Sequence, residues 1–528
     1  MLFNSAPFLL WFLPCALVGY FGLGRHGTVP ASLWLVAASL FFYGWSDPSA
    51  IPILVLSILG NYGLGRLLGA THERPVLQAW VCRVGIAVNL AALGYYKYFA
   101  GLLGLAGAIG LLPSPIPAIA LPLGISFFTF TQIGYLLDVR DGTADSKNFL
   151  EYTILITFFP HLIAGPILQH REIMPQLAAP GARRISMMNL SVGAGIFIIG
   201  LAKKTLLADP SSIGVDEAFS HPEALTLFVA WHAALSYSLQ LYFDFSGYSD
   251  MAIGLARMFN LSFPLNFDSP YKARSIIDYW QRWHMTLTRF LTRHIYTPLS
   301  LAVMRRRAAR RQAINQTAQK TWQGFAEMIA LPVFVTIGLA GIWHGSGAQF
   351  LAFGLLHASF LTANRAWRIW FGASIPRGRL GVVWRVSLTY LCVLVGSIFF
   401  RTGSVSDALT MLTAMLGSRG FGPGLPVPAW LAERSGGIGW LRPADPHAIL
   451  RTAREVAWLA GLYVIVWGMP NTQQIFARAR PALEAVVAPT APWLVWRPNL
   501  PWALVLGGLA TLGLLSLGGT GEFLYFQF

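Results

Sequence analysis

The chain has 528 residues, of which 55% are hydrophobic and only 11% are charged. Together with a mean hydropathy of +0.55, this balance excludes an ordinary soluble protein and indicates a polytopic membrane protein. The net charge of +16 is unevenly placed and matches no recognition module, so we expect membrane topology rather than nucleic-acid binding to explain it.

Apolar segments long enough to cross a bilayer, about 20 residues each, recur along the whole chain. We interpret segment 5–23 as a retained first helix rather than a secretion signal, because it lacks a basic start and a small-residue cleavage site. Clear spans are predicted at 5–23, 30–46, 50–70, 79–98, 150–168, 188–207, 223–243, 328–344, 347–363, 380–400, 453–470 and 500–519, and weaker ones at 104–121, 122–138 and 247–262.

In a bilayer every backbone polar group must be satisfied within the protein, so all regular structure should be helical. The fold is therefore predicted to be all-α, with about 11 to 13 transmembrane helices plus re-entrant and interfacial helices. No repeat of fixed period and no long polar segment divides the chain, so residues 1–528 are predicted to form a single domain. The stretch 417–446 is rich in Gly and Pro and is predicted to be an extramembrane loop.

Neither the cysteines nor the acidic residues suggest a metal site. Cys15, Cys82 and Cys392 lie in apolar stretches without C-x-x-C spacing, so we expect buried packing residues rather than a disulfide framework or a zinc site. A cation site on the acidic pair described next would need more ligands than that spacing supplies. We therefore predict no bound metal.

Two carboxylates, Asp244 and Asp250, and Gly247 between them interrupt an apolar run that begins at Gln240. Buried carboxylates need partners, and Arg257 is a basic residue near them in sequence. One interpretation is structural, with both acids capping a broken or re-entrant helix and pairing with basic residues. The other is functional, with Gln240, Asp244 and Asp250 bordering a polar cavity beside His344 and binding substrate.

The segment 272–320 carries eleven basic residues against one acid, Asp278. Basic loops remain cytoplasmic, so this segment should face the cytosol. Aromatic, aliphatic and charged residues alternate within 276–284, which is typical of helices that lie at the membrane interface. The segment either contacts lipid headgroups and sets the topology, or it also receives a phosphate-bearing donor such as acyl-CoA, with Trp280 and Arg282 as candidate substrate-binding residues.

His344 lies inside a run from Met328 to Asn364 that contains no charged residue. An ionisable group at membrane depth is costly unless it faces protein or water, so His344 is a functional candidate. Acyl transfer from a thioester to a hydroxyl needs a general base, and we predict His344 in that role, accompanied by His284 and by Trp343 as a substrate-binding residue. The absence of a G-x-S-x-G elbow favours direct transfer over a serine acyl-enzyme.

Several motifs occur in a characteristic order along the chain, at 123–132, 159–166, 240–250, 280–284, 341–345 and 399–401. Together they resemble the membrane-bound O-acyltransferase family, and within it the bacterial alginate O-acetyltransferase branch. We take residues 121–401 as the motif-bearing catalytic core. Each motif alone would be weak, whereas chance does not explain their common order.

The resemblance implies an integral inner-membrane enzyme, passing the membrane many times, whose helices surround a central tunnel. In that family the histidine that matches His344 is catalytic, the one that matches His284 lies along the same path, and cytosolic acyl-CoA serves as donor substrate without a bound cofactor. The branch commonly works with a periplasmic acetyltransferase partner that completes delivery to a secreted polysaccharide. The chain departs from the pattern at Ala340-Gly341, where a double glycine is common, and at 300–305, where a glycine-rich turn is common.

The predicted function is a membrane O-acyltransferase that moves acetyl from cytosolic acetyl-CoA across the inner membrane for O-acetylation of an exopolysaccharide, with alginate, cellulose and peptidoglycan all open as acceptors. The alternative is a saccharide or lipid transporter or flippase, whose midplane histidines would serve proton coupling. Replacement of His344 separates the two hypotheses, because a transferase would lose glycan modification and a transporter would lose glycan export.

Overall fold

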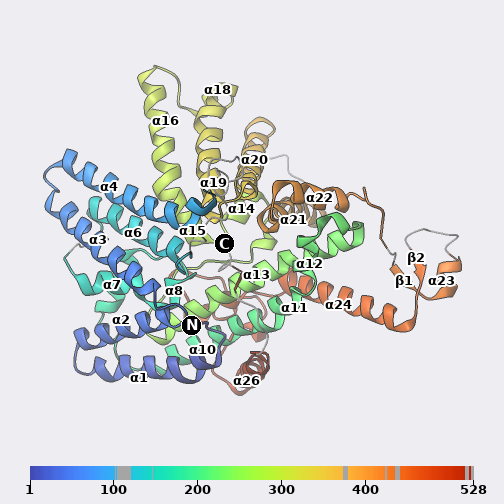
Figure 1. Cartoon of the computed structure of the whole chain (residues 1–528), viewed down its shortest axis with the longest axis horizontal. Coiled ribbons are helices and arrows are strands. Elements are labelled where there is room, and N and C mark those ends of the chain that lie inside the picture. The colour runs from blue at the N-terminus through green and yellow to red at the C-terminus, as the bar shows by residue number, and fades with distance from the viewer. Residues whose placement is uncertain are drawn as a thin grey trace. The chain divides into compact units, whose positions relative to one another are not determined.

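The computed structural model describes residues 1–101, 103, 120–144, 147–372, 378–422, 425–434, 441–517 and 523–524 (Figure 1). Regular structure in these residues is almost entirely helical, which confirms the all-α prediction. The strands found there are β1 (Leu425–Val427) and β2 (Leu441–Pro443), which pair in parallel within the stretch predicted as a loop. The weak predicted span 104–121 lies almost wholly outside the described residues.

The chain divides into two compact units. Unit 1 comprises residues 1–206, 244–266 and 470–528, and unit 2 comprises residues 207–243 and 267–469. A single domain over residues 1–528, with a core at 121–401, stays a prediction.

Unit 1 is built from the helices that open the chain and from those that close it. Within it α1 packs against α2, α3 and α4 pack against α6, and α10 packs against α26. Its elements are η1 (Phe8–Phe12), α1 (Leu13–Gly24), α2 (Thr28–Gly44), α3 (Ala50–Ala70), α4 (Pro75–Gly94), η2 (Tyr95–Phe99), α6 (Ile125–Arg140), α7 (Phe149–Thr157), α8 (Phe159–Leu162), α9 (His170–Ala178), α10 (Met187–Ala202), η3 (Lys203–Ala208), the C-terminal part of α13 (Leu227–Met258), α25 (Thr472–Ile475), η8 (Ala477–Ala479), η9 (Pro492–Leu494) and α26 (Leu500–Leu515).

Unit 2 holds the basic segment and the histidine motifs. Its core helices are α19, α20 and α21, which pack successively against one another. Its elements are α11 (Asp209–Ser211), α12 (Val215–Ser220), η4 (Pro222–Ala224), the N-terminal part of α13, η5 (Pro270–Lys272), α14 (Ile276–Trp280), α15 (Met285–Leu291), η6 (Thr292–Tyr296), α16 (Thr297–Ala309), α17 (Gln316–Gln319), α18 (Trp322–Phe325), η7 (Ala326–Ala330), α19 (Leu331–His344), α20 (Ala348–Trp370), α21 (Arg379–Arg401), α22 (Val405–Met415), α23 (Ala429–Arg434) and α24 (Pro446–Gly468).

Five helices in the described part of the chain are long and apolar enough to cross a membrane: Ala50–Ala70, Pro75–Phe99, Met187–Ser211, Trp322–His344 and Arg379–Arg401. Shorter apolar helices cover Phe8–Gly24, Thr28–Gly44, Val405–Met415 and Leu500–Leu515. The total of about 11 to 13 spans and the central tunnel stay predictions.

The predicted span at 150–168 is wrong. Its helical parts are α7, with 9 residues, and α8, with 4 residues. At about 1.5 Å per residue, neither part approaches the thickness of a bilayer core, about 30 Å. Phe158 adopts a non-helical backbone between them (φ −51°, ψ 110°), and Pro160 lies at the start of α8.

Helix α13 is continuous over 32 residues, so the break expected near Gly247 is wrong. Gly247 instead allows a close approach to α10, because a Cβ atom there would lie 2.8 Å from the carbonyl oxygen of Gly200. Two turns further along, a Cβ atom at Gly254 would lie 2.6 Å from the carbonyl oxygen of Gly193. Small residues that bring backbones together are typical of helix crossings in membranes.

Beyond this crossing, two lysines that follow α10 reach the carboxylates of α13. Lys204 Nζ lies 2.6 Å from Asp244 Oδ1, and Lys203 Nζ lies 2.6 Å from Asp250 Oδ2. The side chains of Lys204 and Asp244 are only 2% and 3% exposed. Both acids therefore pair with basic residues, but Arg257 is not their partner, because it donates to Ser262 and to the carbonyl of residue 479.

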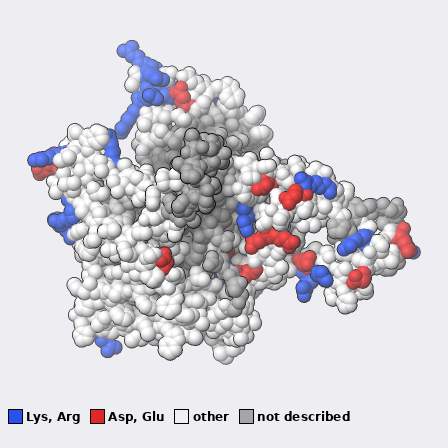
Figure 2. Space-filling view, in the orientation of Figure 1, with Lys and Arg blue, Asp and Glu red and all other residues white. Residues whose placement is uncertain are grey.

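The basic segment forms short helices, of which α15, η6 and α16 follow one another without a break. This stretch is not among the helices apolar enough to cross a membrane. Basic side chains gather over α16, at the top of Figure 2. Arg307 of α16 is instead buried and donates to Glu327 Oε2 at 2.6 Å, so the charge of this segment is only partly available to ligands.

The cysteine prediction holds only in part. All three cysteines are free, and Cys82 is buried while Cys392 is partly buried. Cys15 is exposed on α1, so the prediction of buried packing is wrong for this residue. An exposed cysteine on an apolar helix is compatible with a surface that contacts lipid.

The Lys204–Asp244 pair should be a major contributor to the stability of unit 1. Lys204→Met removes the nearest cation from a buried carboxylate, and we expect the free energy of unfolding to fall by about 3–5 kcal/mol. Denaturation of the purified protein in detergent measures this change, with Lys320→Met as a control because Lys320 is exposed.

The double variant Lys204→Met/Asp244→Leu should recover much of this loss, because no charge is then left alone. Equal destabilisation in the single and the double variant would show that side-chain packing, not charge pairing, is responsible.

Candidate active site

His344 is the last residue of α19, at the turn into α20. The two helices touch through glycines, because a Cβ atom at Gly341 would lie 2.4 Å from the carbonyl oxygen of Phe350 and 2.9 Å from Cα of Gly354. The two helices therefore approach closely although Ala340 takes the place of one residue of the common double glycine. Backbone contact of this kind fixes the end of α19, and with it the position of the imidazole.

Aromatic rings surround the His344 side chain, and the residue is only 7% exposed. The centroid of its ring lies 4.8 Å from that of Trp343, 5.0 Å from that of Phe400 and 6.0 Å from that of Phe353. Phe400 belongs to the last of the predicted motifs, at 399–401, which lies on α21. Rings packed this closely limit the access of water to the imidazole.

His284 immediately precedes α15 and is 1% exposed. Its backbone adopts the left-handed conformation, with φ 45°, which is uncommon for a residue with a side chain and recurs at functional sites. Its ring lies 6.4 Å from the ring of Trp343. The structure thus brings together three predicted residues, with the indole of Trp343 in contact range of both histidines.

Trp280 connects to this group through His357. The indole Nε1 of Trp280 donates to Nδ1 of His357 at 3.3 Å. The ring of Phe353 lies 4.6 Å from that of His357 and 6.0 Å from that of His344. Phe353 and His357 are four residues apart on α20 and share a face of the helix, so an aromatic column runs along α20 from His344 toward Trp280.

His357 is a residue of this site to which the sequence interpretation assigned no role. It is 1% exposed, and a Cβ atom at Gly396 on α21 would lie 2.4 Å from its Nε2. The spacing of Phe353, His357 and Phe360 along one helix face was the available signal. The contribution of α21 could not be read from the local sequence, because it depends on tertiary packing.

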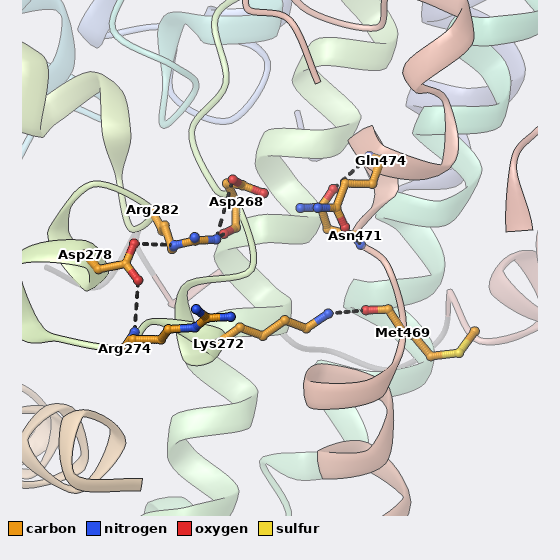
Figure 3. Close-up of polar contacts among 8 residues, drawn as sticks. All are labelled: Asp268, Lys272, Arg274, Asp278, Arg282, Met469, Asn471 and Gln474. Atoms are coloured by element: carbon orange, nitrogen blue, oxygen red, sulfur yellow. Dashed lines mark hydrogen bonds and ion pairs between the residues drawn. The ribbon is translucent and has the colours of Figure 1, made fainter. Parts of the chain in front are cut away.

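Arg282 holds the chain just before His284. Its Nε donates to Asp278 Oδ1 at 2.7 Å, and its guanidinium also donates to the carbonyl of Asp268 at 3.2 Å (Figure 3). Asp278 Oδ2 in turn accepts from the backbone N–H of Arg274 at 2.9 Å. These contacts give Arg282 a structural part in ordering the turn, while substrate binding by Arg282 stays a prediction.

The other predicted site residues lie in different units. Gln240 belongs to unit 2, is 7% exposed, and has a buried side-chain oxygen that finds no hydrogen-bond partner among the described residues. Asp244 and Asp250 belong to unit 1, where the lysines described above hold them. A cavity shared by Gln240, Asp244, Asp250 and His344 stays a prediction.

A hydroxyl cluster in unit 2 is a second feature that the sequence interpretation missed. The hydroxyl of Tyr271 donates to the carbonyl oxygen of Ser238 at 2.6 Å, and the hydroxyls of Ser238, Tyr390 and Tyr463 hydrogen-bond in series. Its members come from α13, η5, α21 and α24. Residues this far apart in sequence carry no common local pattern, so only the folded chain reveals the cluster.

Comparisons with a family model and with individual known proteins agree with one another. A model of the membrane-bound O-acyltransferase family matches residues 143–313. The chain is 35% identical over 451 residues to a peptidoglycan O-acetyltransferase of Helicobacter pylori, and the alignment covers 80% of each chain. It is 32% identical over 539 residues to a probable alginate O-acetylase of Pseudomonas putida, and this alignment covers 100% of each chain.

A more distant relative is a teichoic acid D-alanyltransferase of Bacillus subtilis, 25% identical over 284 residues that cover 53% of this chain and 68% of that protein. All three relatives are named as transferases of small acyl groups. Together with the apolar helices, these similarities show that the chain is a multi-pass membrane enzyme that belongs to the membrane-bound O-acyltransferase family.

Proposed function

We propose that this enzyme takes acetyl from cytosolic acetyl-CoA and moves it across the inner membrane for O-acetylation of a secreted polysaccharide. The observation that carries the proposal is the grouping of His284, Trp343 and His344 in a buried aromatic pocket of an acyltransferase. A buried imidazole is a suitable general base for acyl transfer to a hydroxyl. The roles of the site residues and the identity of the donor are proposals. The acyltransferase class follows from the similarity to known family members.

In the proposed reaction, the imidazole of His344 accepts the proton of the attacking hydroxyl. The hydroxyl oxygen bonds to the thioester carbonyl carbon, the carbon–sulfur bond breaks, and the CoA thiolate leaves and takes up the proton. We place His284 along the same path, with its ring centroid 6.4 Å from that of Trp343. The surrounding rings of Phe353 and Phe400 exclude water, which suppresses hydrolysis of the thioester.

The acceptor is proposed to be a glycan hydroxyl, with an alginate-like exopolysaccharide favoured. The relative that aligns over the full length of this chain is named for alginate, while the Helicobacter pylori relative is named for peptidoglycan. Both names describe O-acetylation of a glycan. A periplasmic acetyltransferase partner that completes delivery belongs to this proposal, as does the inner-membrane location.

Replacement of His344 tests the proposal directly. His344→Ala should lower acetylation of the secreted glycan at least about a hundredfold, because the general base of the transfer is gone. Acetate released by mild alkali from purified exopolysaccharide and from purified peptidoglycan measures the product and identifies the acceptor.

His26→Ala is a matched control because His26 is exposed on the first helical hairpin of unit 1. A folded His344→Ala protein that sustains wild-type acetylation of both glycans would contradict the assignment of His344. Loss of polysaccharide export with normal acetylation of the exported material would favour a transport function instead.

The glycine contact between α19 and α20 should also be required for activity. Gly341→Ala places a Cβ atom 2.4 Å from the carbonyl oxygen of Phe350, so the helix end that carries His344 must shift. A displacement of about 1 Å at a reacting group can lower a rate about a hundredfold, and we expect at least a tenfold loss of acetyl transfer.

Gly338→Ala is the matched control on the same helix, because its Cβ atom would meet only Leu355 at an ordinary 3.8 Å. Acetyl transfer and elution from a sizing column should be measured for both variants. Equal activity of the two alanine variants would show that the close approach does not position His344.

A further inference from the structure

A cavity of about 840 Å³ lies among α14, α20 and α21 in unit 2. Its charged lining is strongly unbalanced, with one acid, Asp278, against four basic residues, Arg274, Arg365, Arg368 and Arg385. An excess of guanidinium groups around a cavity favours an anionic ligand, above all a phosphate, which the planar fork of arginine binds in a bidentate manner.

The one acid in this lining does not balance the four arginines. Asp278 is already occupied by Arg282 and by a backbone N–H group. Arg368 donates to the hydroxyl of Ser275 at 3.3 Å, and Arg385 donates to the carbonyl of Gly381 on its own helix. In the part of the chain that the structure describes, none of the four lining arginines forms an ion pair with a carboxylate.

A polar group in the same wall points to a second feature of the ligand. The side-chain oxygen of Asn364 is buried and has no hydrogen-bond partner among the described residues. A buried acceptor of this kind is unfavourable unless a donor reaches it. A ligand that carries a hydroxyl close to its phosphate would supply that donor.

The rest of the lining is mainly apolar and extends to an exposed helix face. Trp384, Leu388 and Cys392 of α21 line the cavity. The neighbouring positions Leu380 and Val383 are 86% and 61% exposed, and Trp384 itself is 63% exposed. In a membrane-spanning helix such residues meet lipid chains, so an apolar tail in the cavity would continue along the lipid-facing side of α21.

The arginine end of the cavity lies away from His344, while Phe360 of its lining reaches His357, with ring centroids 6.0 Å apart. From Ala348, beside His344, to Arg365 the helix α20 advances about 26 Å at 1.5 Å per residue. Trp280 and His357, which hydrogen-bond to each other, occupy part of the interval. Tryptophan and arginine together are typical of the level of lipid headgroups.

We infer that this cavity binds one anionic glycerophospholipid whose headgroup carries a hydroxyl, as in phosphatidylglycerol. The phosphate is held by Arg274, Arg365 and Arg368, the headgroup hydroxyl donates to Asn364, and one acyl chain lies along α21. The lipid is a ligand of the fold, not the acyl donor, so this inference does not depend on the proposed reaction.

Native mass spectrometry of the full chain in detergent tests the inference. Phosphatidylglycerol and phosphatidylcholine with identical chains are titrated against the wild type and the variant Arg365→Gln/Arg368→Gln. The wild type should bind phosphatidylglycerol at least tenfold more tightly than phosphatidylcholine, and the variant should lose this preference. Arg305→Gln/Arg306→Gln on α16, an equal change of charge at two exposed positions, should retain it.

A second variant, Asn364→Leu, should weaken phosphatidylglycerol more than phosphatidic acid, which lacks the headgroup hydroxyl. The inference is overturned if the Arg365/Arg368 variant keeps the preference, or if the α16 control loses it equally. It is also overturned if the Arg365/Arg368 variant loses binding of acetyl-CoA while phosphatidylglycerol still binds as in the wild type, since the cavity would then serve the donor.

Discussion

The contact between α19 and α20 is the constraint on which the catalytic region depends. Gly341 and Gly354 bring the two backbones together, and a side chain at either position would separate them. The contact places His344 at the end of a closely packed helix pair rather than on a loop, where thermal motion would make its position less well defined. Phe353 and His357 then project from the same face of α20, so one helix pair supports both His344 and the aromatic column that leads to Trp280.

Composition and motifs predicted the class of the protein and the grouping of His284, Trp343 and His344. Hydropathy predicts the helices of a membrane protein because a bilayer forces an apolar span to satisfy its backbone hydrogen bonds within a helix. It failed at 150–168, where apolar content is high but Phe158 and Pro160 divide the helix. It failed again at Gly247, which was interpreted as a break and in fact serves close packing against Gly200. Glycine permits both outcomes, and only the neighbouring helix decides between them.

The acidic residues illustrate a further limit of local reasoning. Asp244 and Asp250 need cations as partners, which the sequence indicates, but the lysines that pair with them lie 40 and 47 positions earlier in the chain. Such partners are fixed by the crossing of α10 and α13, not by proximity along the chain. For the same reason, the sequence did not predict a role for His357 or for the hydroxyls of Tyr271 and Tyr390. Each of these groups contacts a helix that is distant in sequence.

In the proposed reaction, His344 is the group that meets the acyl donor. A structure of the full-length enzyme bound to a non-hydrolysable acetyl-CoA analogue would test this claim most directly. We expect the acetyl carbonyl carbon within about 4 Å of the His344 imidazole, the range needed for a reactive arrangement, with the nucleotide on the side of the basic segment. A bound analogue whose acetyl group lies away from both His344 and Trp343 would contradict the account.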